Sequence, residues 1–315
     1  SKRQGALQNF TIAIPAAMSV TLIGVGATYV VNGDLSIGVL IGANILAARA
    51  FGPIARFGTF TEIFAKARHS VQLANDLILL ERERQNGSII SNISGKIKLR
   101  DISICYTSNT TPLFEHLSIE LAPGEVLAIV GPNGSGKSSF VKMILGLLSP
   151  TRGQIFIDGI NIEQLLPNWW RKQISYVPQD PRFIPGTIRE NITILAKDNS
   201  HKKIDNVLKL SGLQTFIDQS KLGIDAPILA GGVGLTLGIR RRLALARAIL
   251  ADGSFLVIDE PTEGMDSYGA QLVYDTMNMF AKKKATVITC SHDINIVKGA
   301  DWIIQLGEKA TPKVT

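Results

Sequence analysis

The amino-acid sequence predicts two parts of different fold class: an all-α hairpin in residues 1–84 and an α/β domain in residues 96–315, joined by a linker at 85–95. Three observations carry this prediction. The first is a run from residue 4 to residue 33 that contains no charged residue. The second is the succession of short β-branched runs and helical patterns after residue 95. The third is a G-x-x-x-x-G-K-S stretch between one predicted strand and one predicted helix.

Composition places the chain among proteins that are partly embedded in a membrane. Of its 315 residues, 45% are hydrophobic, the mean hydropathy is +0.19 and the formal net charge is +7. A basic balance is also typical of nucleic-acid-binding proteins, but Lys and Arg beside membrane spans produce the same sum. The chain begins at Ser1 without a signal-peptide pattern, so we expect it to be the C-terminal part of a longer polypeptide.

Two apolar segments form the predicted membrane hairpin. The first, Phe10–Val31, has about the 20 residues that a membrane-spanning helix needs. The second, Leu35–Ala48, is shorter, and it is extended only where Arg49 reaches toward the lipid headgroups. Turn residues at Asn32–Asp34 separate the two. Basic residues flank the other ends of both segments: Lys2, Arg3, Arg49, Arg56, Lys66 and Arg68. By the positive-inside rule those ends lie in the cytoplasm, and the turn faces outward.

After the second segment the pattern becomes amphipathic. Residues 61–84 carry apolar side chains at helical spacing, namely Ile63, Phe64, Ala67, Val71, Ala74 and Leu77. This spacing predicts that the second span continues as a helix into the cytoplasm. The composition then shifts to Gly, Ser and Asn, which is typical of a linker between domains.

The glycine-rich stretch predicts a phosphate-binding loop. An apolar run at residues 126–130 precedes it, and a helical run at 139–148 follows it, which is the context that such a loop requires. Its glycines let backbone N–H groups turn toward the α- and β-phosphates, Lys137 reaches the β/γ oxygens, and Ser138 ligates Mg²⁺. We therefore predict an ATP and Mg²⁺ site that contains Gly131, Pro132, Asn133, Gly134, Ser135, Gly136, Lys137, Ser138 and Ser139.

The stretch FLVIDEP, residues 255–261, predicts a buried strand that ends in two acids. Asp259 would enter the Mg²⁺ shell, and Glu260 would face the water that attacks the γ-phosphate. Two adjacent acids at a strand end are otherwise a solvated turn. With a phosphate-binding loop upstream, we interpret them as catalytic.

Residues from about 95 to 315 resemble the nucleotide-binding domain of an ATP-binding cassette (ABC) transporter in the order of these motifs. The resemblance implies a P-loop NTPase cassette with a RecA-like core, a helical subdomain that starts near residues 185–192, and an antiparallel β subdomain. It implies that Tyr106 stacks on adenine and that Gln179 contacts Mg²⁺ and the attacking water. It also implies that Asp266 belongs to the D-loop and that His292 contacts the γ-phosphate.

The membrane hairpin is similar to the exporter branch of that family, in which six spans precede the cassette, so this chain would hold the last two. Residues 30–58 resemble the fifth-to-sixth span region of type I secretion exporters. The resemblance implies a multi-pass ATPase and permease of the inner membrane, with its cassette on the cytoplasmic side. It implies as partners a second half-transporter in a homo- or heterodimer, a periplasmic adaptor, an outer-membrane channel, an exported protein and the lipid bilayer, but no nucleic acid. Multidrug and lipid exporters are the alternatives.

The segment LTLGI, Leu235–Ile239, aligns with the LSGGQ signature by which this family closes the ATP site of the facing subunit. Thr236 keeps a hydroxyl and Gly238 keeps a glycine, whereas Leu237 replaces a glycine and Ile239 replaces a glutamine. Loss of one donor at a developing charge slows chemistry by about 10²–10³. Two hypotheses follow: an ATPase that a partner's signature completes or that tolerates LTLGI as a homodimer, and a catalytically weak regulatory half of a heterodimer.

Three arginines, Arg240, Arg241 and Arg242, follow the signature segment, and nearby Ala230 stands where exporters usually have a glutamate. Arg242 matches a basic position of the family pattern, while the other two equally fit a solvated helix face. Nucleic-acid recognition would need a basic groove with aromatic residues, and the charge-free run at residues 4–33 argues against it.

Overall fold

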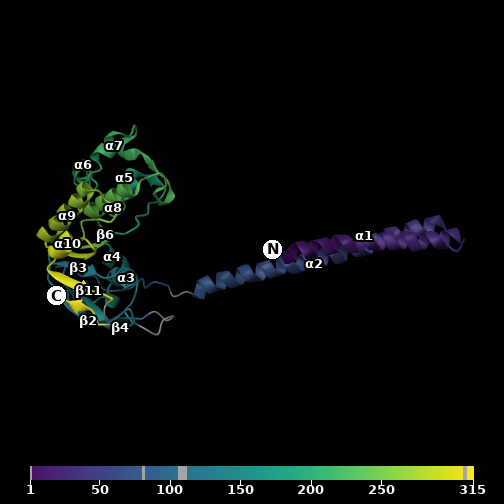
Figure 1. The fold of residues 1–315 in the computed structure, drawn as a ribbon, viewed down its shortest axis with the longest axis horizontal. Helices are drawn as coiled ribbons and strands as arrows, with labels where there is room; N and C mark the ends of the chain where they lie inside the picture. The colour runs from purple at the N-terminus through teal and green to yellow at the C-terminus, as the bar shows by residue number, and fades with distance from the viewer. Residues whose placement is uncertain (1, 80–81, 106–111, 308–310) are drawn as a thin grey trace. The chain divides into compact units, whose positions relative to one another are not determined.

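The computed structural model describes residues 2–79, 82–105, 112–307 and 311–315 (Figure 1). Contacts between residues divide the chain into two compact units, Ser1–Arg82 and Glu83–Thr315.

The first unit is a helical hairpin of α1 (Lys2–Val31) and α2 (Ile37–Leu79), which lie side by side (Figure 1). The part of α1 from Ala13 to Val31 is long and apolar enough to cross a membrane, by length and composition, whereas the apolar part of α2, Ile37–Ala50, is shorter. Helix α2 runs without interruption from the apolar into the amphipathic segment, as the sequence pattern predicts.

The second unit is built around a six-stranded sheet in the order β12-β11-β3-β10-β9-β6. Its strands are β3 (Val126–Val130), β6 (Ile174–Val177), β9 (Phe255–Asp259), β10 (Thr286–Cys290), β11 (Trp302–Gln305) and β12 (Lys313–Val314). All neighbouring pairs are parallel except β11 and β12. Continuous apolar runs form these central strands because a parallel sheet is buried on both faces. The two predicted catalytic stretches follow β3 and β9, so both lie at the carboxyl edge of this sheet.

A second sheet, antiparallel throughout, has the order β2-β1-β4-β5. Its strands are β1 (Ile97–Ile104), β2 (Phe114–Leu121), β4 (Arg152–Ile157) and β5 (Ile160–Asn161). In the first part of β1, buried and exposed residues alternate, because one face of this sheet packs on the core and the other meets solvent. This sheet is the antiparallel β subdomain that the family resemblance implies.

Helices lie on and around the central sheet. They are α3 (Lys137–Ile144), α4 (Pro167–Arg171), α5 (Ile188–Thr193), α6 (His201–Leu210), α7 (Gln214–Asp218), α8 (Leu237–Ala251), α9 (Ser267–Lys282) and α10 (Ile294–Lys298). Helices α3, α8 and α9 pack on the central sheet, and the further helices lie around them. Short 3₁₀ turns occupy Ile162–Gln164, Gly223–Asp225 and Ala230–Gly232, and a two-stranded sheet joins β7 (Gly186–Thr187) to β8 (Pro227–Ile228). Within this unit α5, α6 and α7 gather at the end opposite β2 and β4 (Figure 1), and they form the predicted helical subdomain.

The core consists of two apolar clusters, one on each face of the central sheet. Phe255 and Val257 of β9 belong to the cluster that includes the antiparallel sheet and α3. Leu256 and Ile258 of the same strand belong to the cluster that includes α6, α8 and α9. Alternate side chains of β9 thus enter opposite layers, which fixes this strand within a packed interior.

The residues that the sequence predicts as a linker, 85–95, lie in the second unit. The Ser88 backbone pairs with Leu165 and bonds to the backbones of Gln164 and Leu166, while Glu83 forms an ion pair with Arg171 of α4. These contacts attach the start of the second unit to the surface around α4.

Candidate active site

The phosphate-binding loop is formed where β3 ends and α3 begins. Gly131 has φ +153°, and a Cβ atom built on it would lie 2.5 Å from the Leu306 carbonyl oxygen and 2.7 Å from Ser135 Oγ. Only glycine fits this position without a shift of the backbone. The chain therefore turns tightly onto the start of α3, where backbone N–H groups and the helix dipole favour an anion.

Lys137, the first residue of α3, lies in the middle of a group of residues that are distant in sequence. Its side chain is 8% exposed, and its Nζ donates a hydrogen bond to the Gly131 carbonyl oxygen at 2.6 Å. The same Nζ lies 3.1 Å from His292 Nε2 and 3.6 Å from Glu260 Oε1, and His292 Nε2 lies 3.5 Å from that oxygen. The structure thus brings three of the predicted catalytic residues into one cluster.

Asp259 and Ser138 provide oxygen atoms beside this cluster. Ser138 Oγ lies 3.5 Å from Asp259 Oδ2, and Asp259 is 7% exposed. Burial raises the pKa of Asp259, and the negative charge of Glu260 raises it further. A divalent cation bound here would favour the ionised carboxylate, and carboxylate and hydroxyl oxygens are the ligands that Mg²⁺ prefers. These residues therefore fit the predicted magnesium site.

A cavity of about 410 Å³ opens over the loop and contains Lys137, Ser138, Gln179, Asp259 and Glu260 in its lining. A second cavity, of about 630 Å³, shares Asn133, Gln179 and Glu260 with the first and adds Thr262, Glu263, Ser291, His292 and Asp293. Gln179 thus lies between them, beside the predicted metal ligands. Tyr106, which the resemblance places on adenine, lies outside the described residues.

The predicted binding residues Thr236, Gly238 and Asp266 do not line either of these two cavities. Asp266 caps α9, because its Oδ1 accepts a hydrogen bond from the Gly269 N–H at 2.7 Å. Thr236 caps α8, because its Oγ1 accepts from the Ile239 N–H at 3.4 Å. Within this chain all three remain apart from the phosphate-binding loop.

The signature segment keeps a helix start despite its unusual residues. Leu237 is the first residue of α8 and is 37% exposed. A Cβ atom built on Gly238 would meet no atom within 4 Å among the described residues. Because α8 begins at Leu237, leucine in place of glycine leaves the first turn of this helix intact. The difference from the family signature is the exposed leucine side chain on this turn.

Each of the three consecutive arginines pairs with an acid of the same chain. Arg240 lies 3.1 Å from Asp180, Arg241 lies 3.4 Å from Glu263, and Arg242 lies 3.4 Å from Asp266. The Arg241 side chain is only 4% exposed, so the interpretation of Arg241 as part of a solvated helix face is wrong. Sequence reasoning also missed Glu263, whose acidic side chain follows the two acids of the motif by only a few residues.

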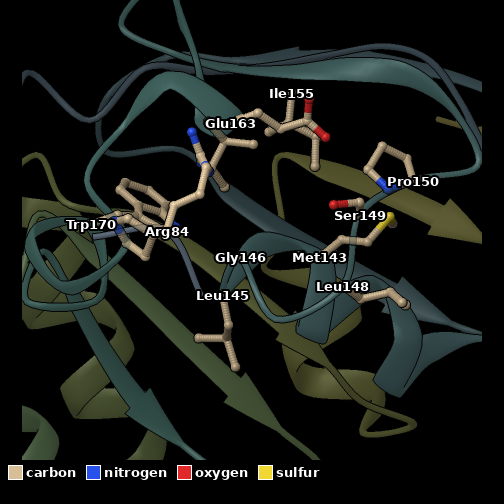
Figure 2. Close-up of a pocket in the computed structure, with 12 residues that line it drawn as sticks. Arg84, Met143, Leu145, Gly146, Leu148, Ser149, Pro150, Ile155, Glu163 and Trp170 are labelled. Atoms are coloured by element: carbon tan, nitrogen blue, oxygen red, sulfur yellow. The ribbon is translucent and has the colours of Figure 1, made fainter. Parts of the chain in front are cut away.

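A smaller cavity, of about 70 Å³, lies elsewhere in the second unit (Figure 2). Arg84, Glu163 and Trp170 line it, together with residues from the end of α3. Trp170 is anchored beside it, because its Nε1–H donates to the Ile144 carbonyl oxygen at 2.9 Å. None of its lining residues belongs to the phosphate-binding loop, so this cavity is no part of the site.

Comparison with known proteins agrees with this geometry. The sequence model of the ABC transporter family matches residues 114–263, which include the loop, the two acids and the signature segment. The leukotoxin export ATP-binding protein of Aggregatibacter actinomycetemcomitans is 32% identical over 292 residues, which are 92% of this chain and 41% of that protein. The alpha-hemolysin translocation ATP-binding protein of Escherichia coli is 33% identical over 280 residues, which are 89% of this chain and 40% of that protein. The chain belongs to the ABC transporter family.

A solved structure supports the same assignment. A bacterial Atm1-family ABC exporter with ATP bound superposes with a TM-score of 0.69 at 26% sequence identity, and the match covers 97% of this ABC transporter chain and 55% of that one. The predicted family and fold class are thereby confirmed. The chain spans about two fifths of the length of the curated relatives above, at 41% and 40%.

Proposed function

We propose that this chain is the ATP-hydrolysing cassette, with part of the membrane domain, of an ABC exporter that drives type I secretion of a protein across the inner membrane. The observation that carries the proposal is the convergence of Lys137, Glu260 and His292 beside Ser138 and Asp259. These side chains are the groups that phosphoryl transfer to water requires.

The chain's own residues divide the chemistry among them. Lys137 exchanges the Gly131 carbonyl oxygen for phosphate oxygens, and the N–H groups at the start of α3 bind the remaining negative charge. Ser138, Asp259 and Gln179 would hold Mg²⁺, which neutralises charge on the phosphates when bound. Glu260 accepts a proton from the attacking water, and His292, within 3.5 Å of Glu260, donates a hydrogen bond toward the γ-phosphate.

The export function is supported by the first unit and by the relatives. Ala13–Val31 is suited to cross a membrane, and the curated relatives are named for leukotoxin export and hemolysin translocation. By this proposal the chain lies in the inner membrane with its cassette in the cytoplasm. A second half-transporter completes the dimer, and a periplasmic adaptor and an outer-membrane channel receive the exported protein. Multidrug or lipid export is the alternative.

A second candidate function is a weak ATP-binding half that regulates a heterodimer. The observation that favours it is the exposed Leu237 side chain at the first position of α8, where the family signature has glycine. Ile239 also lacks the polar side chain of the glutamine that it replaces. Because Lys137, Glu260 and His292 are all present, we place the weakness in the site that this signature would close on the partner, not in the chain's own site.

The test is phosphate release from MgATP by the purified full-length protein in detergent, compared with Glu260→Gln. We expect the variant to bind ATP like the wild type and to lose about 10²-fold or more of its turnover, because it lacks the proton acceptor. Unchanged turnover would rule out the role of Glu260. Slow release by the wild type that a partner with an LSGGQ signature restores would show an ATPase completed by its partner, whereas release that stays slow with such a partner would select the second candidate.

A further inference from the structure

Glu263, in the loop between β9 and α9, connects two parts of the cassette. Its Oε2 accepts a hydrogen bond from Gln179 Nε2 at 3.2 Å and another from Arg241 Nη2 at 3.4 Å. Gln179 follows β6, and Arg241 lies about one turn into α8. One carboxylate oxygen therefore links the residue beside the predicted magnesium site to the helix that begins at the signature segment.

Arg241 provides the fixed end of this link. Its side chain is 4% exposed, and its Nε and Nη1 are buried without a hydrogen-bond partner in the described part of the chain. A guanidinium stays charged in proteins, and a buried charge without a counter-charge is costly. Glu263 supplies the counter-charge, so Arg241 holds the Glu263 side chain in place although it is 60% exposed.

The Glu263 carboxylate determines which atom of the Gln179 amide group points toward it. An ionised carboxylate only accepts hydrogen bonds, so Glu263 binds the amide nitrogen. The opposite end of the amide is the carbonyl oxygen, which is the atom that binds a cation. Gln179 lines both the cavity with Ser138 and Asp259 and the cavity with Glu263, so its side chain is placed to face both groups.

We propose that Glu263 is a positioning residue for Gln179: it turns the amide so that Oε1 faces the magnesium site, and the buried Arg241 holds it there. This inference rests on the proposed function, because it presupposes that MgATP binds at the phosphate-binding loop. It makes the orientation of a magnesium ligand depend on the first turns of α8.

The test is the affinity of the full-length protein for a fluorescent, non-hydrolysable ATP analogue, measured with Mg²⁺ and with EDTA. In Glu263→Gln the new side chain donates as well as accepts, so the preference for the amide nitrogen of Gln179 is lost. We expect the affinity with Mg²⁺ to fall about tenfold and the affinity with EDTA to stay within about twofold, because partners that orient a ligand act on the metal. Arg241→Met is expected to weaken the Mg²⁺-dependent affinity in the same direction.

The chain offers a matched control in Arg240 and Asp180, which lie 3.1 Å apart. This pair joins the segment after β6, which also holds Gln179, to α8 without involving Glu263. Asp180→Asn should leave both affinities within about twofold of wild type, because exposed ion pairs contribute little. If Glu263→Gln does not fold because Arg241 is left uncompensated, the double variant Glu263→Gln/Arg241→Met removes the buried charge and carries the same expectation.

Equal losses with Mg²⁺ and with EDTA would show a merely structural role and overturn the inference, as would an unchanged affinity with Mg²⁺. A wild-type protein that binds the analogue under neither condition refutes the proposed function instead.

Discussion

The geometry of Gly131 predicts a large cost for adding a single methyl group. In Gly131→Ala the new Cβ would lie 2.5 Å from the Leu306 carbonyl oxygen, and the residue would keep a φ of +153° that alanine rarely adopts. Backbone strain of this kind costs about 1–3 kcal/mol, and the forced shift of packed atoms adds about 1–3 kcal/mol. We therefore expect the free energy of unfolding to fall by about 2–6 kcal/mol.

Gly134 in the same loop separates the two contributions. It also has a positive φ, of +85°, but a Cβ atom built on it meets no described atom within 4 Å. Gly134→Ala should therefore carry only the backbone strain, about 1–3 kcal/mol. The difference between the two variants, about 2 kcal/mol, corresponds to a difference of roughly 4–8 °C in unfolding temperature for a unit of this size.

The assay is thermal unfolding followed by tryptophan fluorescence. Trp169, Trp170 and Trp302 are the three tryptophans of the chain and all lie in the second unit, so their fluorescence reports on the unit that holds the loop. Equal unfolding temperatures for the two variants would refute the reasoning, because the close approach to Leu306 would then contribute nothing. A Gly131→Ala protein as stable as the wild type would refute both contributions.

Two further predictions concern electrostatics and the signature. Hydrogen bonds from Lys96 and then Lys98 lower the pKa of Glu120 to about 2, so ionised Glu120 contributes stability above its ordinary pKa of 4.5 that is lost as the pH falls toward 2. Glu120→Gln should therefore unfold at a lower temperature than wild type at pH 6 and at nearly the same temperature near pH 2; a gap that persists at pH 2 contradicts this assignment. For the signature, Leu237→Gly combined with Ile239→Gln should raise phosphate release by the full-length protein about 10–10²-fold. The reason is that the leucine side chain no longer keeps the backbone N–H groups of α8 from the γ-phosphate, and the glutamine adds an amide donor. Equal rates in the variant and the wild type would exclude an impaired signature.

Much of the fold could be predicted from local patterns. The apolar runs before Gly131 and through Ile258 predicted β3 and β9, since both are short, continuous and bounded by turn residues or acids. The unbroken α2 followed from its helical spacing. The motifs predicted that Lys137 and Glu260 meet at one site. His292 could be added only through the family resemblance, because strand order in the central sheet is not a local property.

The environment of the three arginines could not be predicted from sequence. Their spacing on α8 is equally compatible with solvent and with burial, and the partner of each is set by the loop that packs beside it. Arg240, Arg241 and Arg242 lie 60, 22 and 24 residues from their acids. No periodicity within a single helix contains that information.

By itself, the sequence determined the order of the glycine-rich loop, the paired acids and the LTLGI segment, and it determined the apolar helix that precedes them. These are properties of neighbouring residues, which share a strand, a turn or a helix whatever the rest of the chain does. Only the tertiary structure decided that Arg241 is buried and that Glu263 joins it to Gln179. The physical reason is that burial and charge compensation depend on which loops the parallel sheet brings to the same edge, and sheet order arises from packing between distant segments.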